Sequence, residues 1–315
     1  MSDDVLILGS TDTTLAVADA ATAQGIRVAA IAHTGATFSI SYAPGGVRNA
    51  RAADIPGWCA RHHAREIAFE NFRSLESALG DHQFSACLVA GWHHKVPRTF
   101  RARFGDRCVG YHASLLPALR GGAPLNWAIL AGLEETGVSL FVLGDGVDDG
   151  PIYGQERFAV GSGSYVSDLV DASAAASVAL TRRYLPGIVS GLATPAPQVG
   201  DPSYGLQRSP EDGRVDWSRA ATDIHRLVRA VSRPYAGAKT RFGDRELAIH
   251  RAAVMSNVPT ILGSPGQIAA ISGIPAPVIV CGEGALAIEE AVFEGGESAI
   301  QFLQDSSNQR LGRRP

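Results

Sequence analysis

A histidine and an aspartate follow two apolar segments that are typical of neighbouring strands. His112 comes directly after the run 107–111, and Asp148 comes after the run 138–143 and a short turn. A histidine exchanges a proton near neutral pH, and a carboxylate can orient its ring. Ligands of open α/β sheets bind at the carboxyl ends of the strands. The pattern predicts an acid–base pair at one sheet edge, with simple turn packing of His112 as the alternative.

Short apolar runs alternate with helical stretches through most of the chain, which is typical of a parallel sheet. We expect strands at 5–9, 28–32, 66–68, 86–90, 107–111, 138–143 and 152–158. Helices are expected at 13–24, 55–63, 72–79, 123–132 and 167–184. The fold class predicted for this part is α/β, with a Rossmann-like, mostly parallel sheet that places the histidine and the aspartate at its edge.

The final third of the chain has a different pattern. Prolines break the periodicity near residues 186–202, and we expect a linker at 193–207. Beyond the linker, 218–231 has the apolar spacing of an amphipathic helix. Short apolar runs at 238–242, 246–250, 266–270, 278–281 and 285–288 are typical of a small β-barrel. The expected domains are therefore residues 1–195 and 208–315.

Composition indicates a two-domain globular protein. A chain of 315 residues exceeds the usual size of one core, and 45% hydrophobic residues supply core material. Its four scattered cysteines form no Cys-x-x-Cys pair, and its first apolar run is too short for a signal peptide. We expect a reduced, cytoplasmic protein. Its adjacent histidine pairs lack the spacing of metal ligands on one helix face, so no metal is expected.

The motifs around His112 and Asp148 resemble the folate-dependent formyltransferases. The matching stretches are His-Ala-Ser-Leu-Leu-Pro at 112–117, Arg-Gly-Gly-Ala-Pro-Leu-Asn-Trp at 120–127, and Val-Asp-Asp-Gly at 147–150 followed by Gln155. Residues 204–217 resemble the entry to the family's C-terminal domain. The resemblance implies a formyltransferase-fold catalytic domain followed by an OB-like β-barrel domain.

The resemblance also implies an activity. The chain would transfer a formyl group from 10-formyltetrahydrofolate to the amine of a small molecule, such as a nucleotide-linked amino sugar or a hydroxyornithine. His112 would be the general acid and base, assisted by Asp148. Folate would contact Trp92, Val96, Pro97, Leu115 and Asp145, and the acceptor would contact Tyr111, Ser114 and Gly122.

Gly110 is the main departure from the family pattern. The family's transferases carry an asparagine there, whose amide helps to hold the formyl oxygen. Loss of such a donor lowers turnover by about 100- to 1000-fold. Asn126, protonated His112, a backbone N–H of the Ser114 loop or a water could replace it. The hydrolase domain of formyltetrahydrofolate dehydrogenase also lacks the asparagine, so a 10-formyltetrahydrofolate hydrolase and a catalytically inactive folate-binding protein are alternatives.

Charge bears on the identity of the acceptor. The net charge is −3, and residues 33–48 contain one arginine, Arg48, besides a histidine. Proteins that bind nucleic acid usually carry clustered basic residues. We therefore expect neither a nucleic acid nor a membrane as partner, and methionyl-tRNA formyltransferase is a further alternative. The C-terminal domain is expected to be a packing or dimerising unit, which makes a homodimer a candidate assembly.

Overall fold

The computed structural model describes residues 3–40, 43–256 and 261–312, and the chain divides into two compact units. The first unit comprises residues 1–124, 135–159 and 171–205, and the second comprises 125–134, 160–170 and 206–315. The expected domains ended at 195 and began at 208. The structure instead joins the end of the expected linker to the first unit, and it adds two earlier segments to the second.

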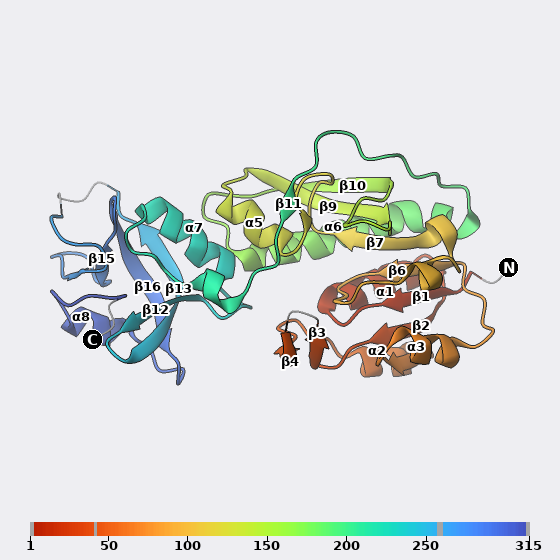
Figure 1. Cartoon of the computed structure of the whole chain (residues 1–315), viewed down its shortest axis with the longest axis horizontal. Coiled ribbons are helices and arrows are strands. Elements are labelled where there is room, and N and C mark those ends of the chain that lie inside the picture. The colour runs from red at the N-terminus through yellow and green to blue at the C-terminus, as the bar shows by residue number, and fades with distance from the viewer. Residues whose placement is uncertain (1–2, 41–42, 257–260, 313–315) are drawn as a thin grey trace. The chain divides into compact units, whose positions relative to one another are not determined.

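A seven-stranded sheet forms the centre of the first unit, with the order β10-β9-β7-β6-β1-β2-β5 (Figure 1). Its strands are β1 (Val5–Leu8), β2 (Val28–His33), β5 (Arg65–Ala68), β6 (Ala86–Val89), β7 (Cys108–His112), β9 (Glu135–Val142) and β10 (Ile152–Ala159). Five of them, β1, β2, β5, β6 and β7, are paired in parallel. β9 runs antiparallel to β7, and β10 runs antiparallel to β9 and therefore in the direction of the other five. The predicted Rossmann-like, mostly parallel sheet is confirmed.

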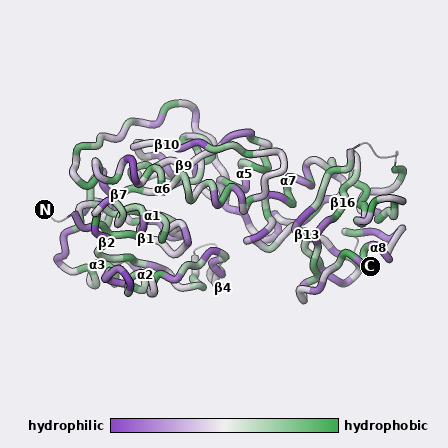
Figure 2. The backbone as a smooth tube through the Cα atoms, turned by 180° about the vertical axis from the view of Figure 1, so that it is seen from behind, coloured by the Kyte–Doolittle hydropathy of each residue, from purple (hydrophilic) through white to green (hydrophobic). Residues whose placement is uncertain are grey.

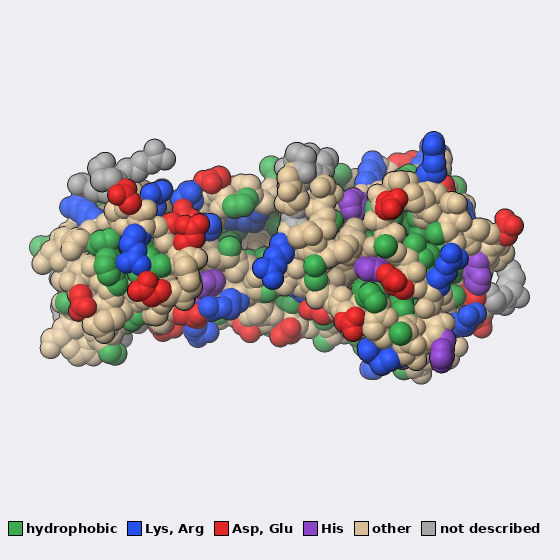
Figure 3. All heavy atoms as spheres, turned by 90° about the horizontal axis from the view of Figure 1, so that it is seen from below, with side chains coloured by type: hydrophobic (Ala, Val, Ile, Leu, Met, Phe, Trp, Pro, Cys, Tyr) green, Lys and Arg blue, Asp and Glu red, His purple; other side chains and the backbone are tan. Residues whose placement is uncertain are grey.

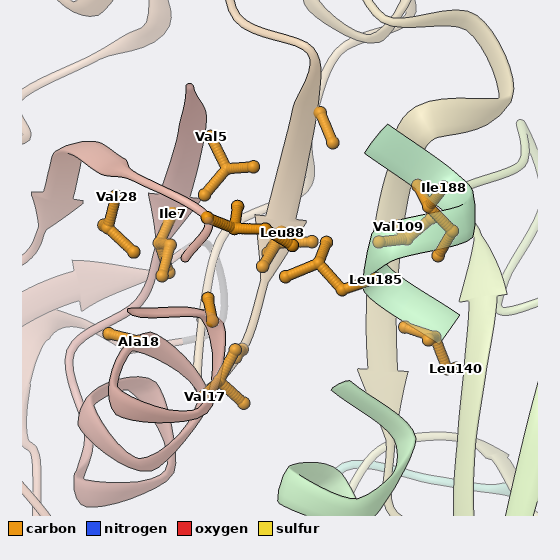
Figure 4. Close-up of a cluster of buried hydrophobic side chains, with 14 of the residues drawn as sticks. Val5, Ile7, Val17, Ala18, Val28, Leu88, Val109, Leu140, Leu185 and Ile188 are labelled. Atoms are coloured by element: carbon orange, nitrogen blue, oxygen red, sulfur yellow. The ribbon is translucent and has the colours of Figure 1, made fainter. Parts of the chain in front are cut away.

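Alternating residues of the strands face two different hydrophobic clusters, as the period of two requires. Val5 and Ile7 of β1 pack in one cluster with Leu185 and Ile188 (Figure 4). Leu6 and Leu8 belong to the other cluster. The first cluster includes residues of α1 (Asp12–Thr22), α2 (Ile55–His62) and α6 (Val166–Ser190), and the second includes residues of α3 (Phe72–Leu79) and α4 (Arg98–Arg101). Figure 2 shows the hydrophobic residues concentrated along these strands.

Several short elements surround the sheet of the first unit. A hairpin of β3 (Thr37–Ile40) and β4 (Ala43–Arg48) was not expected from the sequence. The strand β8 (Arg120–Gly121) pairs with β11 (Tyr204–Gly205), so the end of the expected linker is itself hydrogen-bonded to the loop after His112.

The second unit contains a five-stranded antiparallel sheet with the order β12-β13-β16-β15-β14. Its strands and helices are β12 (Ala238–Phe242), β13 (Arg245–Val254), β14 (Ile268–Ala269), β15 (Val278–Val280), β16 (Ala285–Phe293), α5 (Pro124–Leu130), α7 (Ala221–Val231) and α8 (Ile300–Asp305). The expected amphipathic helix is present as α7, with Ile224 and Val228 buried. In the part of the chain that the structure describes, no helix has both the length and the apolar character needed to cross a membrane.

Candidate active site

His112 is the last residue of β7, and its ring lies between a carboxylate and a backbone carbonyl. Nδ1 is 3.4 Å from Oδ2 of Asp148, and Nε2 is 2.8 Å from the carbonyl oxygen of Leu119. Because a carbonyl only accepts hydrogen bonds, Nε2 carries a proton and Nδ1 faces the carboxylate. The structure thus brings together the two residues that the sequence predicted to meet. The route differs from the expected one, because β9 runs antiparallel to β7 and Asp148 returns to His112 through the loop after β9.

The Asp148 turn is held in a strained conformation by contacts from two other segments. Asp148 has a φ of +48°, a left-handed backbone that costs a non-glycine residue about 1–2 kcal/mol. Its Oδ2 accepts a hydrogen bond from the N–H of Gly121 at 2.8 Å. The amide nitrogen of Gln198 donates to the carbonyl oxygens of Asp148 and Gly150 at 2.7 and 2.8 Å. Strain of this kind is typical of functional sites, where surrounding contacts maintain it.

Sequence reasoning missed Gln198, because it lies inside the segment expected to be a linker. Arg120 donates two hydrogen bonds to Oε1 of Gln198, at 2.6 and 3.2 Å. Arg120 stands in the motif at 120–127, but the sequence does not indicate its partner, which is 78 positions away. The expected linker therefore supplies a residue that positions the acid of the site.

A second polar pair holds the loop that follows His112. Ser139 is fully buried on β9, and its hydroxyl donates to the carbonyl of Ser114 at 2.7 Å and accepts the N–H of Leu116 at 3.0 Å. Gln155 on β10 donates to both the Ser139 hydroxyl and the Leu116 carbonyl. A serine between apolar residues of β9 was the signal in the sequence that could have identified this pair.

Apolar side chains fill the space beside Gly110. Gly110 lies on β7 two residues before His112, hence on the same face of the strand. A Cβ atom added there would lie 2.7 Å from Cδ2 of Leu143 and 3.2 Å from Cε1 of Phe141. The Phe141 ring is edge-on to the His112 ring, with the two centroids 6.4 Å apart. The family's amide is therefore replaced by an apolar wall.

Two residues expected to serve the site donate their hydrogen bonds elsewhere. Asn126 belongs to the second unit, and its amide donates to the carbonyl oxygen of Ala230 at 2.6 Å. The hydroxyl of Tyr111 is 2.7 Å from Oγ1 of Thr181 on α6, and burial raises the pKa of this phenol. Tyr111 and His112 are neighbours on a strand, so their side chains leave opposite faces. The structure does not bring Tyr111 to the His112 ring, and the role of Asn126 stays a prediction.

The expected acceptor residues of the loop make contacts within the loop and with β11. Ser114 is buried, and its hydroxyl donates to the carbonyl of Ala118 at 2.5 Å. The N–H of Gly122 donates to the carbonyl of Gly205 at 2.7 Å. Both groups therefore shape the loop, and their contact with an acceptor remains a prediction.

Three of the five expected folate residues follow β6, and one of them belongs to an aromatic cluster. Trp92 packs against Phe69 with ring centroids 4.7 Å apart, and within the described residues its buried Nε1 has no hydrogen-bond partner. An unpaired indole N–H fits a heteroaromatic ring that carries an acceptor atom. Val96 is buried in the second cluster, and Pro97 directly precedes α4.

The remaining two expected folate residues have other contacts. Asp145 pairs with Arg101, and a hydrogen bond from this guanidinium lowers the pKa of the carboxyl group. Leu115 packs so close to Gly137 that a Cβ atom there would lie 2.5 Å from its Cδ2. Over the ranges described, no three His, Cys, Asp or Glu side chains gather as a metal site would require.

Comparison with known proteins identifies relatives for both parts of the chain. The Formyl transferase family model matches residues 4–182, and the model of the Formyl transferase C-terminal domain matches residues 208–303. A methionyl-tRNA formyltransferase from Myxococcus xanthus is 35% identical over 224 residues, which cover 69% of each chain.

Solved structures support the fold. An N-formyltransferase from Helicobacter canadensis, in complex with folinic acid and dTDP-3-aminofucose, has a TM-score of 0.66 at 15% identity and covers 90% of this chain and 98% of its own. HypX from Aquifex aeolicus in complex with tetrahydrofolic acid has a TM-score of 0.62 at 17% identity and covers 93% of this chain and 45% of its own. At such low identity these structures establish the fold alone.

Proposed function

The chain belongs to the formyl transferase family, and on that basis we propose that it moves a formyl group from 10-formyltetrahydrofolate to an amine, with His112 as general acid and base. The observation that carries this proposal is the 3.4 Å approach of His112 Nδ1 to Asp148 Oδ2 at the carboxyl end of β7. A carboxylate on one ring nitrogen orients the other nitrogen for proton transfer.

The proposed reaction begins when the acceptor amine attacks the formyl carbon. For this step the ring proton must lie on Nδ1, where it is donated to Asp148, so that Nε2 leaves the carbonyl of Leu119 as a free base. Nε2 then takes the proton that the amine releases. The bond between the formyl carbon and N10 of the folate then breaks, and His112 returns the proton to N10. Asp148 keeps the ring oriented through Nδ1 and stabilises its charged form between the two proton transfers.

The first candidate acceptor is the amine of methionine carried on tRNA. The relative that is 35% identical to this chain is named methionyl-tRNA formyltransferase, so similarity favours a tRNA-linked amine over the small molecule expected from charge. This ranking corrects the expectation that a nucleic acid is no partner. Net charge was a weak guide because it sums the whole chain, whereas RNA binding depends on the local field of a few basic side chains.

A small amine is the second candidate, because two observations on charge favour it. Residues 33–48 contain one arginine, and on the face shown in Figure 3 the acidic and basic side chains are interspersed. The amine of a nucleotide-linked sugar needs fewer phosphate contacts than a tRNA does.

The experiment that tests the proposed function measures loss of the formyl group from 10-formyltetrahydrofolate. The protein is incubated with methionine-charged initiator tRNA, with a panel of amino sugars and hydroxyornithine, or with no acceptor, and His112→Ala is the control. We expect formyl-methionyl-tRNA to be formed, at a rate that falls as the salt concentration rises.

Three other outcomes would change the proposal. If turnover occurs only with a small amine, that amine replaces methionyl-tRNA as the proposed acceptor. Release of formate from 10-formyltetrahydrofolate and water, without any acceptor amine, would make the protein a hydrolase. The apolar wall beside Gly110 keeps that alternative open. Saturable folate binding without turnover would contradict an enzymatic role.

A further inference from the structure

A cavity of about 530 Å³ lies in the second unit, and the proposed function makes no use of it. Its lining comes from α5 and the turn after it, from residues 160–162, from α7 and from the end of β13. The lining includes neither His112 nor Asp148. Cavities of this size hold small organic molecules, with a few polar groups that fix the orientation of the ligand.

Arg229 is the unusual member of this lining. It is 6% exposed, and Nη1 donates to the carbonyl oxygen of Ser164 at 2.8 Å. Its Nε is buried and has no hydrogen-bond partner among the described residues, and none of the ion pairs found there involves it. A buried charge without a counter-ion is unfavourable by several kcal/mol. The cavity therefore contains a cation that lacks an anion.

Arg226 of α7 brings a second guanidinium to the cavity beside Arg229. His225, Arg226 and Arg229 are spaced i, i+1 and i+4, which places them on adjoining parts of one helical face. Burial lowers the pKa of His225, and the charge of Arg229 lowers it further. Arg226 has a long contact of 3.5 Å to Asp223, and the exposed Glu134 at the cavity is solvated. Neither carboxylate pairs with Arg229.

The remaining lining of the cavity is apolar, and it indicates the chemistry of the rest of the ligand. Ile129, Leu133, Val160 and Val254 are apolar, and Gly132 and Gly161 carry no side chain. A Cβ atom at Gly132 would lie 3.0 Å from Nη2 of Arg226, so the glycine leaves that guanidinium uncovered. The cavity thus offers apolar surface for an organic body beside two guanidinium groups for an anionic head.

We propose that this cavity binds a small organic phosphate, with Arg229 as the direct ligand of a phosphate oxygen and Arg226 as the second guanidinium. A guanidinium presents a planar fork of donors that matches phosphate geometry. A dianionic head supplies acceptors to both arginines, whereas a carboxylate carries a single charge. The apolar side chains then contact the organic part of the ligand. This site is independent of formyl transfer, and its test needs no catalytic assay.

The test titrates the full-length protein with inorganic phosphate, with adenosine monophosphate and with acetate, at constant ionic strength. Calorimetry measures binding, and thermal unfolding measures the stabilisation that follows from binding by mass action. We expect saturable binding of phosphate and tighter binding of adenosine monophosphate, because only the nucleotide has a body that can contact the apolar walls. Acetate should bind more weakly than either.

Two variants identify the site. Arg229→Met should weaken phosphate binding by about 10- to 100-fold, the range expected for a charge-assisted hydrogen bond. Arg226→Gln, at a partly exposed position, should weaken it less, and it carries the test if Arg229→Met does not fold. Arg219→Gln is the matched control, because Arg219 is exposed just before α7 and does not line the cavity.

Four outcomes would overturn the proposal. The first is that neither phosphate compound has a saturable effect at millimolar concentration, and the second is that acetate binds as tightly as phosphate. The third is that Arg226→Gln leaves the affinity for phosphate unchanged. The fourth is that tRNA binds in a way that depends on Arg229 while the small phosphates fail to bind. The last result would make the cavity part of a nucleic-acid surface.

Discussion

The side-chain amide of Gln198 donates a hydrogen bond to the backbone carbonyl of Asp148 at 2.7 Å, across 50 positions of the sequence. Asp148 has a positive φ, so its backbone needs support from outside its own turn. Gln198 provides that support, and Arg120 in turn fixes the amide of Gln198.

Replacement of Gln198 tests whether this support matters for catalysis. In Gln198→Ala the Asp148 turn can relax. We expect kcat to fall by about tenfold with a smaller change in KM, because the variant loses the placement of Asp148 beside His112 and no contact with the substrate. Steady-state kinetics on the best acceptor measures the effect. The control is Gln207→Ala, at an exposed glutamine of the same stretch. Equal kinetics of the two variants would contradict a positioning role.

Removal of the acid–base pair should abolish turnover and leave the fold intact. Acid–base groups contribute about 100- to 10,000-fold each, so His112→Ala and Asp148→Ala should each show losses in that range. The double variant should be little worse than either single variant, because the two residues act as a unit. Circular dichroism checks the fold. A soluble His112→Ala protein with more than about a tenth of the wild-type rate would rule out the assignment.

The apolar wall beside Gly110 gives a third prediction. Gly110→Asn places a Cβ 2.7 Å from Leu143 and should destabilise the protein by about 1–3 kcal/mol, the usual effect of overpacking. Leu143→Ala in the same chain should recover part of that loss, because it vacates the space. Denaturant unfolding measures both, with Leu143→Ala alone as control.

The same double variant also tests the role of the missing amide. If an amide beside His112 can hold the formyl oxygen, Gly110→Asn with Leu143→Ala should turn over faster than Leu143→Ala alone. Similar rates in these two proteins would indicate that the oxyanion is already stabilised by other groups.

A buried histidine predicts how stability depends on pH. His250 is 6% exposed, and burial, together with the charge of Arg233, lowers its pKa, an effect that Glu290 opposes. The unfolded chain therefore binds a proton at a higher pH than the folded chain does. Below a pH of about 6.5 the free energy of unfolding should fall as the pH falls.

His250→Phe removes the group that titrates and should flatten that slope. Chemical unfolding at several pH values between neutrality and mild acid measures it. His63→Asn is the control, since this histidine is exposed at the end of α2. A slope that remains the same in His250→Phe would assign the pH dependence to other residues.

The sequence by itself determined the layers of the first unit and indicated His112 and Asp148 as a pair. Strand periodicity is a local property of the sequence. Alternate residues of β1 therefore face opposite sides of the sheet, with Val5 and Ile7 in one cluster and Leu6 and Leu8 in the other. The strand ends do not explain the contact of His112 with Asp148, because β9 runs antiparallel to β7 and ends beside Val109. Asp148 reaches His112 through the loop that follows β9. The 112–150 motif then identified the family.

Only the tertiary structure decided which residues support the site and what replaces the missing amide. Gln198 reaches Asp148, and Leu143 and Phe141 fill the space beside Gly110, through contacts whose fit depends on side-chain volume and direction in three dimensions. Arg229 looks like an ordinary helix residue in the sequence, and only its burial shows that its charge lacks a partner among the described residues. Such contacts join distant segments, and no local pattern encodes them.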